Sequence, residues 1–341
     1  MRKERIWGLD FARVMCTLGI IGYHFSADTT GVNFLYKTQN FGTGMVFVCA
    51  FFMLSGAVLY YNHPKVTSLK KFYYKRWLSI YPAFYICYFA FFAVLATKSL
   101  LGKSTFLFDS APWTFILTIL GLDGYLMVPV PNFYIVGEWF LGAIVIMYVL
   151  YPAAAKAIET AAGEIIFTLA VAAVFTLSLG GTPLTRLGLH SIVYCFGSFY
   201  VGILLIKHRK FLLDNPAVWT ISAIATYFFW FRFIKPILNG GILNMLAGLT
   251  LLITLYFIGS FVMKAEIIKK PIVFLSNISF EVFLVHHRVI GIVHKLCNPQ
   301  NTGIQFALLL ATIAISEALA ELLNIAAKKT VQWVKSRRSG L

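Results

Sequence analysis

The chain has 341 residues, of which 59% are hydrophobic and only 12% are charged, whereas a soluble protein carries roughly 25% charged residues. With a mean hydropathy of +0.79, the chain has too many apolar side chains for a soluble core, so the composition predicts an all-α polytopic membrane protein. The net charge of +16 would suggest a nucleic-acid partner for a soluble protein, but the basic residues cluster between apolar runs. We therefore expect a lipid bilayer as partner and no nucleic acid.

A helix needs about 20 mainly apolar residues to cross the hydrocarbon core of a bilayer. The candidate runs, in chain order, are 8–27, 43–61, 78–97, 113–122, 139–157, 165–180, 190–206, 217–234, 243–262, 276–294 and 304–325. The run 113–122 is the shortest and ends at Asp123-Gly124. It is therefore the weakest candidate for a membrane span.

Basic clusters predict which ends of these runs face the cytoplasm, because short loops rich in Lys and Arg remain on that side. The clusters lie within 2–5, 65–76, 207–210, 264–270 and 328–338. After run 78–97 has left the cytoplasm, an odd number of crossings is needed to return to it at the third cluster, and four runs lie in between. One of these, the short run 113–122, is therefore taken not to cross, and about ten spans remain, with both termini cytoplasmic. Segment 98–138 then forms a long outer region, for which a re-entrant path stays open. We expect one transmembrane domain over 1–341, in the plasma (inner) membrane.

The first run contains three ionisable residues, Asp10, Arg13 and His24, and such groups are costly inside a bilayer. Arg13 and His24 share one helical face, about 16 Å apart along the axis. Asp10 lies on that face one turn earlier and is positioned to pair with Arg13. The structural alternative is a satisfied ion pair near the interface and a histidine near mid-membrane with no chemical role.

The second run and the segment after it carry two further polar features. Ser55-Gly56 is a pair of small residues of the kind that allows close helix packing, which is the simpler interpretation. Lys75 and Arg76 adjoin aromatic residues in the basic loop before the third span. Membrane topology accounts for their charge, and phosphate binding at the cytoplasmic mouth is the functional alternative.

The run 276–294 contains Glu281 and two adjacent histidines, His286 and His287. Neighbouring residues lie about 100° apart around a helix, so we expect the two histidines to face different ways. His286 lies about ten residues into this run, at a depth comparable to that of His24. The two histidines therefore form a candidate site.

The last run carries Glu317 and Glu321 on one face. We expect them to neutralise Arg13, Arg288 or a lysine in a loop. A zinc site needs three or four converging ligands, and no spacing in the sequence supports one. The sequence therefore predicts no metal.

Several of these residues fall into motifs spread along almost the whole chain. They are Leu9-Asp10-x-x-Arg13 with His24 eleven residues after the arginine, Phe51-Phe52-Met53-Leu54-Ser55-Gly56, Tyr74-Lys75-Arg76 with Tyr81-Pro82, Trp139-Phe140-Leu141 with Tyr151-Pro152, and Phe283-Leu284-Val285-His286. In this order they resemble the motifs of the membrane acyltransferase-3 family, which are integral-membrane O-acyltransferases. The chain resembles the members that lack a fused extracytoplasmic domain.

The resemblance implies transfer of an acyl group, usually acetyl, from cytoplasmic acyl-CoA to a hydroxyl of a carbohydrate or related acceptor. It implies acetyl-CoA as a co-substrate and no bound cofactor. His24 would be the general base, and Arg13, Ser55 or His286 would stabilise the oxyanion. Lys75, Arg76 and Ser55 would contact acyl-CoA, whereas Asp10, Glu281 and Glu317 would balance charge.

Intramembrane charges and histidines are also typical of proton-coupled transporters. A transporter or exporter of a polymer or small molecule is therefore the alternative to an enzyme. Inverted repeats with broken helices would favour transport, and the sequence gives no sign of them. A membrane scaffold without chemistry would leave His24 and His286 unexplained.

Overall fold

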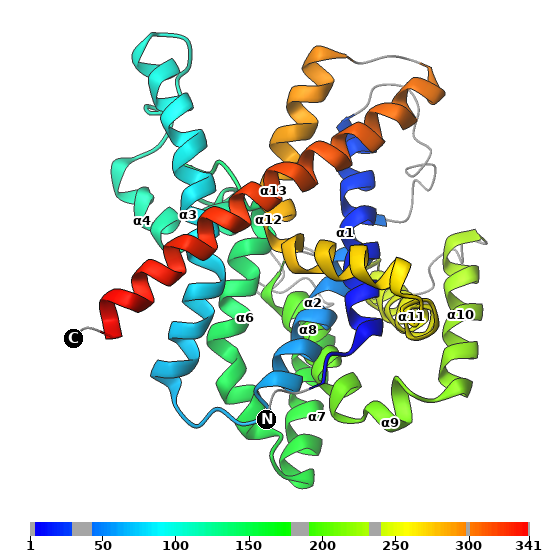
Figure 1. Ribbon diagram of the computed structural model, residues 1–341. Helices are drawn as coiled ribbons and strands as arrows, with labels where there is room; N and C mark the ends of the chain where they lie inside the picture. The colour runs from blue at the N-terminus through cyan, green and yellow to red at the C-terminus, as the bar shows by residue number, and fades with distance from the viewer. Residues whose placement is uncertain (1–3, 29–42, 179–190, 232–239, 298–300, 340–341) are drawn as a thin grey trace. The chain divides into compact units, whose positions relative to one another are not determined.

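A computed structural model describes residues 4–28, 43–178, 191–231, 240–297 and 301–339 (Figure 1). Across these residues the only regular elements are helices, which confirms the predicted all-α class. The chain forms two compact units. The first comprises Met1–Val66, Tyr151–Asn277 and Asn298–Gln305, and the second comprises Thr67–Leu150, Ile278–Cys297 and Phe306–Leu341.

The first unit is built mainly from seven helices: α1 (Trp7–Asp28), α2 (Thr43–Asn62), α7 (Ala161–Ser178), α8 (Ile192–Lys207), α9 (Arg209–Leu212), α10 (Pro216–Phe231) and α11 (Gly240–Val262). The second unit contains α3 (Leu69–Leu100), the 3₁₀ helix η1 (Pro112–Thr114), α4 (Phe115–Ile119) and α5 (Asp123–Leu126). Three helices contribute residues to both units: α6 (Glu138–Ala157), α12 (Glu266–Leu296) and α13 (Thr302–Ser339).

Each run predicted to span the membrane coincides with a helix of 16 residues or more in the described part of the chain. Six of these helices, α2, α3, α6, α7, α11 and α13, are long and apolar enough to cross a bilayer. The protein is therefore a multi-pass membrane protein, whereas a total of ten crossings with cytoplasmic termini stays a prediction. Arg2 and Lys3, which belong to the first basic cluster, lie outside the described residues.

The third predicted span begins earlier than its hydropathy suggested. The apolar run starts at residue 78, but α3 begins at Leu69. Ser68 caps the helix because its hydroxyl accepts a hydrogen bond from the Lys71 backbone N–H at 3.3 Å. Lys75 and Arg76 therefore lie on the second turn of α3 and not in a loop, which corrects the expectation. Charged residues are compatible with a helix outside the bilayer, and hydropathy does not detect that extension.

The core of the first unit centres on α2, which packs against α8 and also contacts α1 and α11 (Figure 1). Two glycines allow the approach of α2 and α8. A Cβ on Gly56 would lie within 3.0 Å of the Phe199 carbonyl, and one on Gly202 within 3.0 Å of the Met53 carbonyl. The packing role predicted for the Ser55-Gly56 pair is confirmed for Gly56.

The second unit contains an irregular segment that turns back alongside the middle of α3. Three tyrosines on one face of α3 donate hydrogen bonds to backbone carbonyls of this segment. The pairs are Tyr81 with Leu120 at 2.8 Å, Tyr85 with Ile119 at 2.6 Å and Tyr88 with Phe133 at 2.8 Å. Irregular backbone at membrane depth persists only where its polar groups are satisfied by protein or water. These contacts favour the re-entrant path left open for 98–138.

The run 113–122 forms η1 and the five-residue helix α4. A helix of this length extends only about 8 Å, far less than the hydrocarbon core of a bilayer. The short helices agree with the prediction that this run does not cross, and the number of crossings stays a prediction.

We predict that Lys103 is accessible from the outer side and Thr67 from the cytoplasm. Both side chains are exposed, and they lie at opposite ends of α3. Cys297 is the exposed native cysteine among the five, so the test uses single cysteines at 67 or 103 in a Cys297→Ser background. An impermeant maleimide added to intact cells should label residue 103, and residue 67 only after lysis. Labelling of residue 67 in intact cells would contradict the topology.

Candidate active site

The predicted site residues divide between the two units. Asp10, Arg13, His24 and Ser55 belong to the first unit, on α1 and α2. Lys75, Arg76, Glu281, His286 and Glu317 belong to the second, on α3, α12 and α13.

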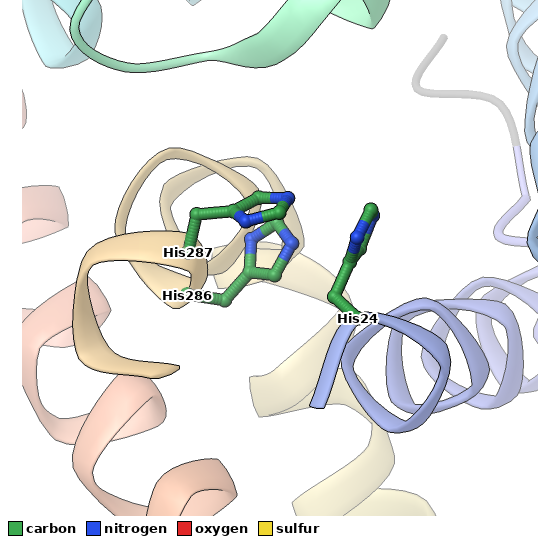
Figure 2. A group of neighbouring side chains, drawn as sticks. All are labelled: His24, His286 and His287. Carbon is green, nitrogen blue, oxygen red and sulfur yellow. The ribbon is translucent and has the colours of Figure 1, made fainter. Parts of the chain in front are cut away.

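His24 lies on α1 (Figure 2), where its ring is half-buried and meets the Tyr23 ring edge-on, with centroids 5.1 Å apart. It comes seventeen residues after Trp7, the first residue of α1, which is about 26 Å along the axis. His24 therefore lies near the C-terminal end of α1, which ends at Asp28. The depth expected for it in the membrane stays a prediction.

The carboxylate of Asp10, which we expected beside Arg13, is bound by Arg5. The Arg5 Nε lies 2.6 Å and its Nη2 2.9 Å from the two carboxylate oxygens. Ser276 of α12 also donates a hydrogen bond to Asp10, at 2.6 Å. The hydrogen bond to Asp10 raises the pKa of Arg5 above its usual value. Asp10 therefore balances charge as predicted, and it joins the start of α1 to α12.

Ser55 and Arg13 are both half-buried in the first unit. Ser55 precedes Gly56, whose missing side chain lets α2 meet α8. Its position is explained by packing, and a contact with acyl-CoA stays a prediction.

Arg76 is held between aromatic rings in the second unit. Its guanidinium carbon lies 5.6 Å from the ring centroid of Tyr148 on α6 and 6.0 Å from that of Phe72. Its Nε is buried and makes no hydrogen bond in the described part of the chain. Lys75 next to it is exposed, and neither cation forms a salt bridge with a carboxylate among the described residues. The pair therefore has donors available for an anion.

His286 and His287 lie against each other on α12 (Figure 2), with ring centroids 4.6 Å apart. The expectation that they face different ways is wrong, because their side chains bend toward each other from neighbouring backbone positions. The His286 Nδ1–H donates a hydrogen bond to the Phe283 carbonyl at 2.8 Å. A carbonyl can only accept, so in the neutral ring the proton is on Nδ1 and the lone pair on Nε2. Neutral His286 is thus suited to accept a proton rather than to stabilise an oxyanion.

Three other charged residues lie in the second unit: Glu281, Arg288 and Glu317. Glu281 is buried, and its carboxylate is attracted by Lys328 and repelled by Glu321. Arg288, which we expected a glutamate to neutralise, donates from Nε to the Ile135 carbonyl at 3.0 Å. Glu317 is half-buried and forms no salt bridge within the described residues. Its role in charge balance stays a prediction.

Sequence reasoning missed Asp123, at the start of α5. Its side chain is 1% exposed, and its Oδ1 accepts a hydrogen bond from the Gly124 N–H at 2.9 Å. Its Oδ2 is buried without a hydrogen-bond partner in the described part of the chain. An acidic residue directly after the apolar run 113–122 is the signal that would have drawn attention to it.

Comparison with known proteins agrees with the motifs. The acyltransferase domain of the acyltransferase-3 family matches residues 6–321, nearly the whole chain. No curated protein and no solved structure matches. The chain belongs to the acyltransferase-3 family, and it is a membrane acyltransferase with an acyl donor and an acceptor as substrates.

The described residues include side chains of the kinds that acyl transfer uses. Neutral imidazoles on α1 and α12 carry a ring nitrogen that can accept a proton. Arg76 and Lys75 offer donors to anionic groups of a substrate. The absence of a metal stays a prediction from the sequence.

Proposed function

We propose that the protein is an O-acyltransferase of the plasma membrane that transfers an acetyl group from cytoplasmic acetyl-CoA to a hydroxyl of a carbohydrate. The observation that carries the proposal is the available guanidinium of Arg76 next to Lys75. An arginine stacked between two aromatic rings is pre-oriented, so it binds phosphate with little loss of side-chain entropy. The CoA phosphates are the anions that such an acyl donor brings.

The chemical step is an attack of the acceptor oxygen on the thioester carbonyl. His24 takes the proton from the acceptor hydroxyl as the new C–O bond forms. Arg13 lies about 16 Å from His24 on the same face of α1 and lines the path of the acyl donor. The C–S bond then breaks, and the CoA sulfur leaves with the proton that His24 carries. His286, which has its lone pair on Nε2, is the alternative base for the same proton.

The direct test incubates the purified protein with acetyl-CoA labelled in the acetyl group and a glycan extract. Label in an ester of the glycan that mild alkali releases would support the proposal. Release of free labelled acetate alone, or no consumption of acetyl-CoA in any extract, would contradict it.

We predict that Arg76→Ala raises the KM for acetyl-CoA about tenfold or more, because a charge-assisted hydrogen bond to phosphate is lost. The matched control is Lys71→Ala, an exposed lysine on the first turn of the same helix. Lys71→Ala and Arg76→Ala each remove one positive charge from the basic cluster 65–76, so the two variants have the same charge there. Isothermal titration with CoA measures the effect in protein that is still monodisperse. An unchanged affinity in Arg76→Ala would exclude this residue from the donor site.

A further inference from the structure

A pocket in the first unit is lined by four basic residues from separate parts of the sequence. Arg5 precedes α1, Arg209 belongs to α9, Lys264 follows α11 and Lys269 lies in α12. The pocket has a volume of about 310 Å³, at the lower end of the usual range for small-molecule sites. Three of the five basic clusters in the sequence thus meet here. The rule that places basic loops in the cytoplasm explains their side of the membrane but does not require them to surround a cavity.

Aromatic side chains form the walls of this pocket. The Lys269 Nζ lies 4.5 Å from the ring centroid of Trp7, and the Arg5 guanidinium carbon lies 5.7 Å from it. Tyr61 donates a hydrogen bond to the Glu4 carbonyl at 2.9 Å, and Tyr256 donates one to Asp214 at 2.7 Å. Because these contacts fix the walls, the pocket is already formed before a ligand arrives.

The basic residues of the pocket are incompletely neutralised. Carboxylates bind three of them, in the pairs Arg5–Asp10 at 2.6 Å, Arg209–Asp214 at 2.9 Å and Lys269–Glu266 at 2.8 Å. Glu266 is 63% exposed, so an incoming anion can replace it at Lys269. Lys264 is exposed and has no carboxylate partner in the described part of the chain, and its Nζ lies 5.0 Å from the Phe261 ring centroid.

We infer that this pocket binds a phosphate-bearing ligand, and that the ligand is the phosphorylated adenosine end of the acyl donor. The inference rests on the proposed function, to which it adds a docking site. Arginine forks and lysine ammonium groups suit phosphate, and aromatic walls suit a planar base, which stacks on such side chains. An anionic lipid headgroup would supply the phosphate but no planar ring, so the aromatic walls favour the nucleotide.

The test measures binding of adenosine 3′,5′-bisphosphate to the full-length protein in detergent. Lys264→Gln should raise the Kd for the bisphosphate about tenfold, because the variant loses a charge-assisted contact to phosphate. Since Lys264 has no carboxylate partner in the described part of the chain, the substitution leaves no carboxylate unpaired. Lys270→Gln is the matched control, since Lys270 is equally exposed but does not line the pocket. Trp7→Leu should weaken the bisphosphate and leave binding of inorganic pyrophosphate unchanged.

A second arm separates the two sources of phosphate. Nanodiscs that contain phosphatidylglycerol are compared with phosphatidylcholine nanodiscs, for the wild type and Lys264→Gln. If Lys264→Gln weakens phosphatidylglycerol binding and not bisphosphate binding, the pocket is a lipid site and the donor assignment is overturned. If the variant changes neither ligand, the pocket does not bind phosphate.

Failure of this inference can be told apart from failure of the proposed function. Wild-type acetyl transfer together with an unchanged KM for acetyl-CoA in Lys264→Gln would overturn the inference and leave the enzyme intact. Bisphosphate binding that depends on Lys264, in a protein that transfers no acyl group, would support the pocket and overturn the function. A raised KM with unchanged kcat in Lys264→Gln would support both.

Discussion

Gly202→Ala is expected to prevent stable folding of the first unit. The new methyl group would lie within 3.0 Å of the Met53 backbone carbonyl on α2, a contact that a change of side-chain rotamer cannot relieve. Overpacking of a core typically costs about 1–3 kcal/mol, and a clash with backbone belongs at the upper end of that range. Gly56→Ala, opposite the Phe199 carbonyl, should act in the same way. The measurement is the yield of monodisperse protein and its thermal midpoint in detergent.

Gly291→Ala is the matched control for these two variants. Gly291 is also a helical glycine, but a Cβ there would meet no atom within 4 Å. Alanine is the better helix former by roughly 0.5–1 kcal/mol, so this variant should fold at least as well as the wild type. A wild-type thermal midpoint for Gly202→Ala would show that α2 and α8 are further apart than described.

The sequence was sufficient to predict the positions of the long helices, because each crossing needs an uninterrupted apolar run. It was less informative about where they begin and end. α3 begins at Leu69 and α13 continues to Ser339, well beyond the apolar runs 78–97 and 304–325. These extensions are polar, so hydropathy does not detect them. Ser68 is a recognisable N-cap and would have marked the true start of α3.

The candidate site was likewise predictable from the sequence only in part. Helical periodicity correctly placed polar residues on helices, but it considers partners only within one helix. It therefore considered only Arg13 as a partner for Asp10 and missed Arg5 from the preceding segment and Ser276 of α12, which both bind it. Side-chain rotamers cannot be predicted from helical periodicity either, so the contact between the His286 and His287 rings was missed. A detectable signal was overlooked in Tyr81, Tyr85 and Tyr88, whose spacing places three hydroxyls on one face of α3.

His24→Ala should reduce acyl transfer by about 10²–10⁴-fold, the usual contribution of a positioned general base. Binding of CoA should be unchanged, since none of the proposed phosphate contacts lies within α1. His294→Ala is the control, because it removes an imidazole eight residues beyond His286 on α12 and should leave transfer near the wild-type rate. His287→Ala is unsuitable as a control, because the ring of His287 contacts that of His286.

The result for His24→Ala distinguishes three mechanisms. Loss of transfer with intact CoA binding assigns the base to His24. Near wild-type transfer would move the base elsewhere, and His286 is the first alternative, because its Nδ1–H is engaged with the Phe283 carbonyl and Nε2 carries the lone pair. His286→Ala would then abolish the reaction. If the wild-type protein never transfers an acyl group, and His24→Ala instead blocks proton-coupled flux of a substrate in proteoliposomes, the intramembrane histidine serves transport and the enzymatic proposal is wrong.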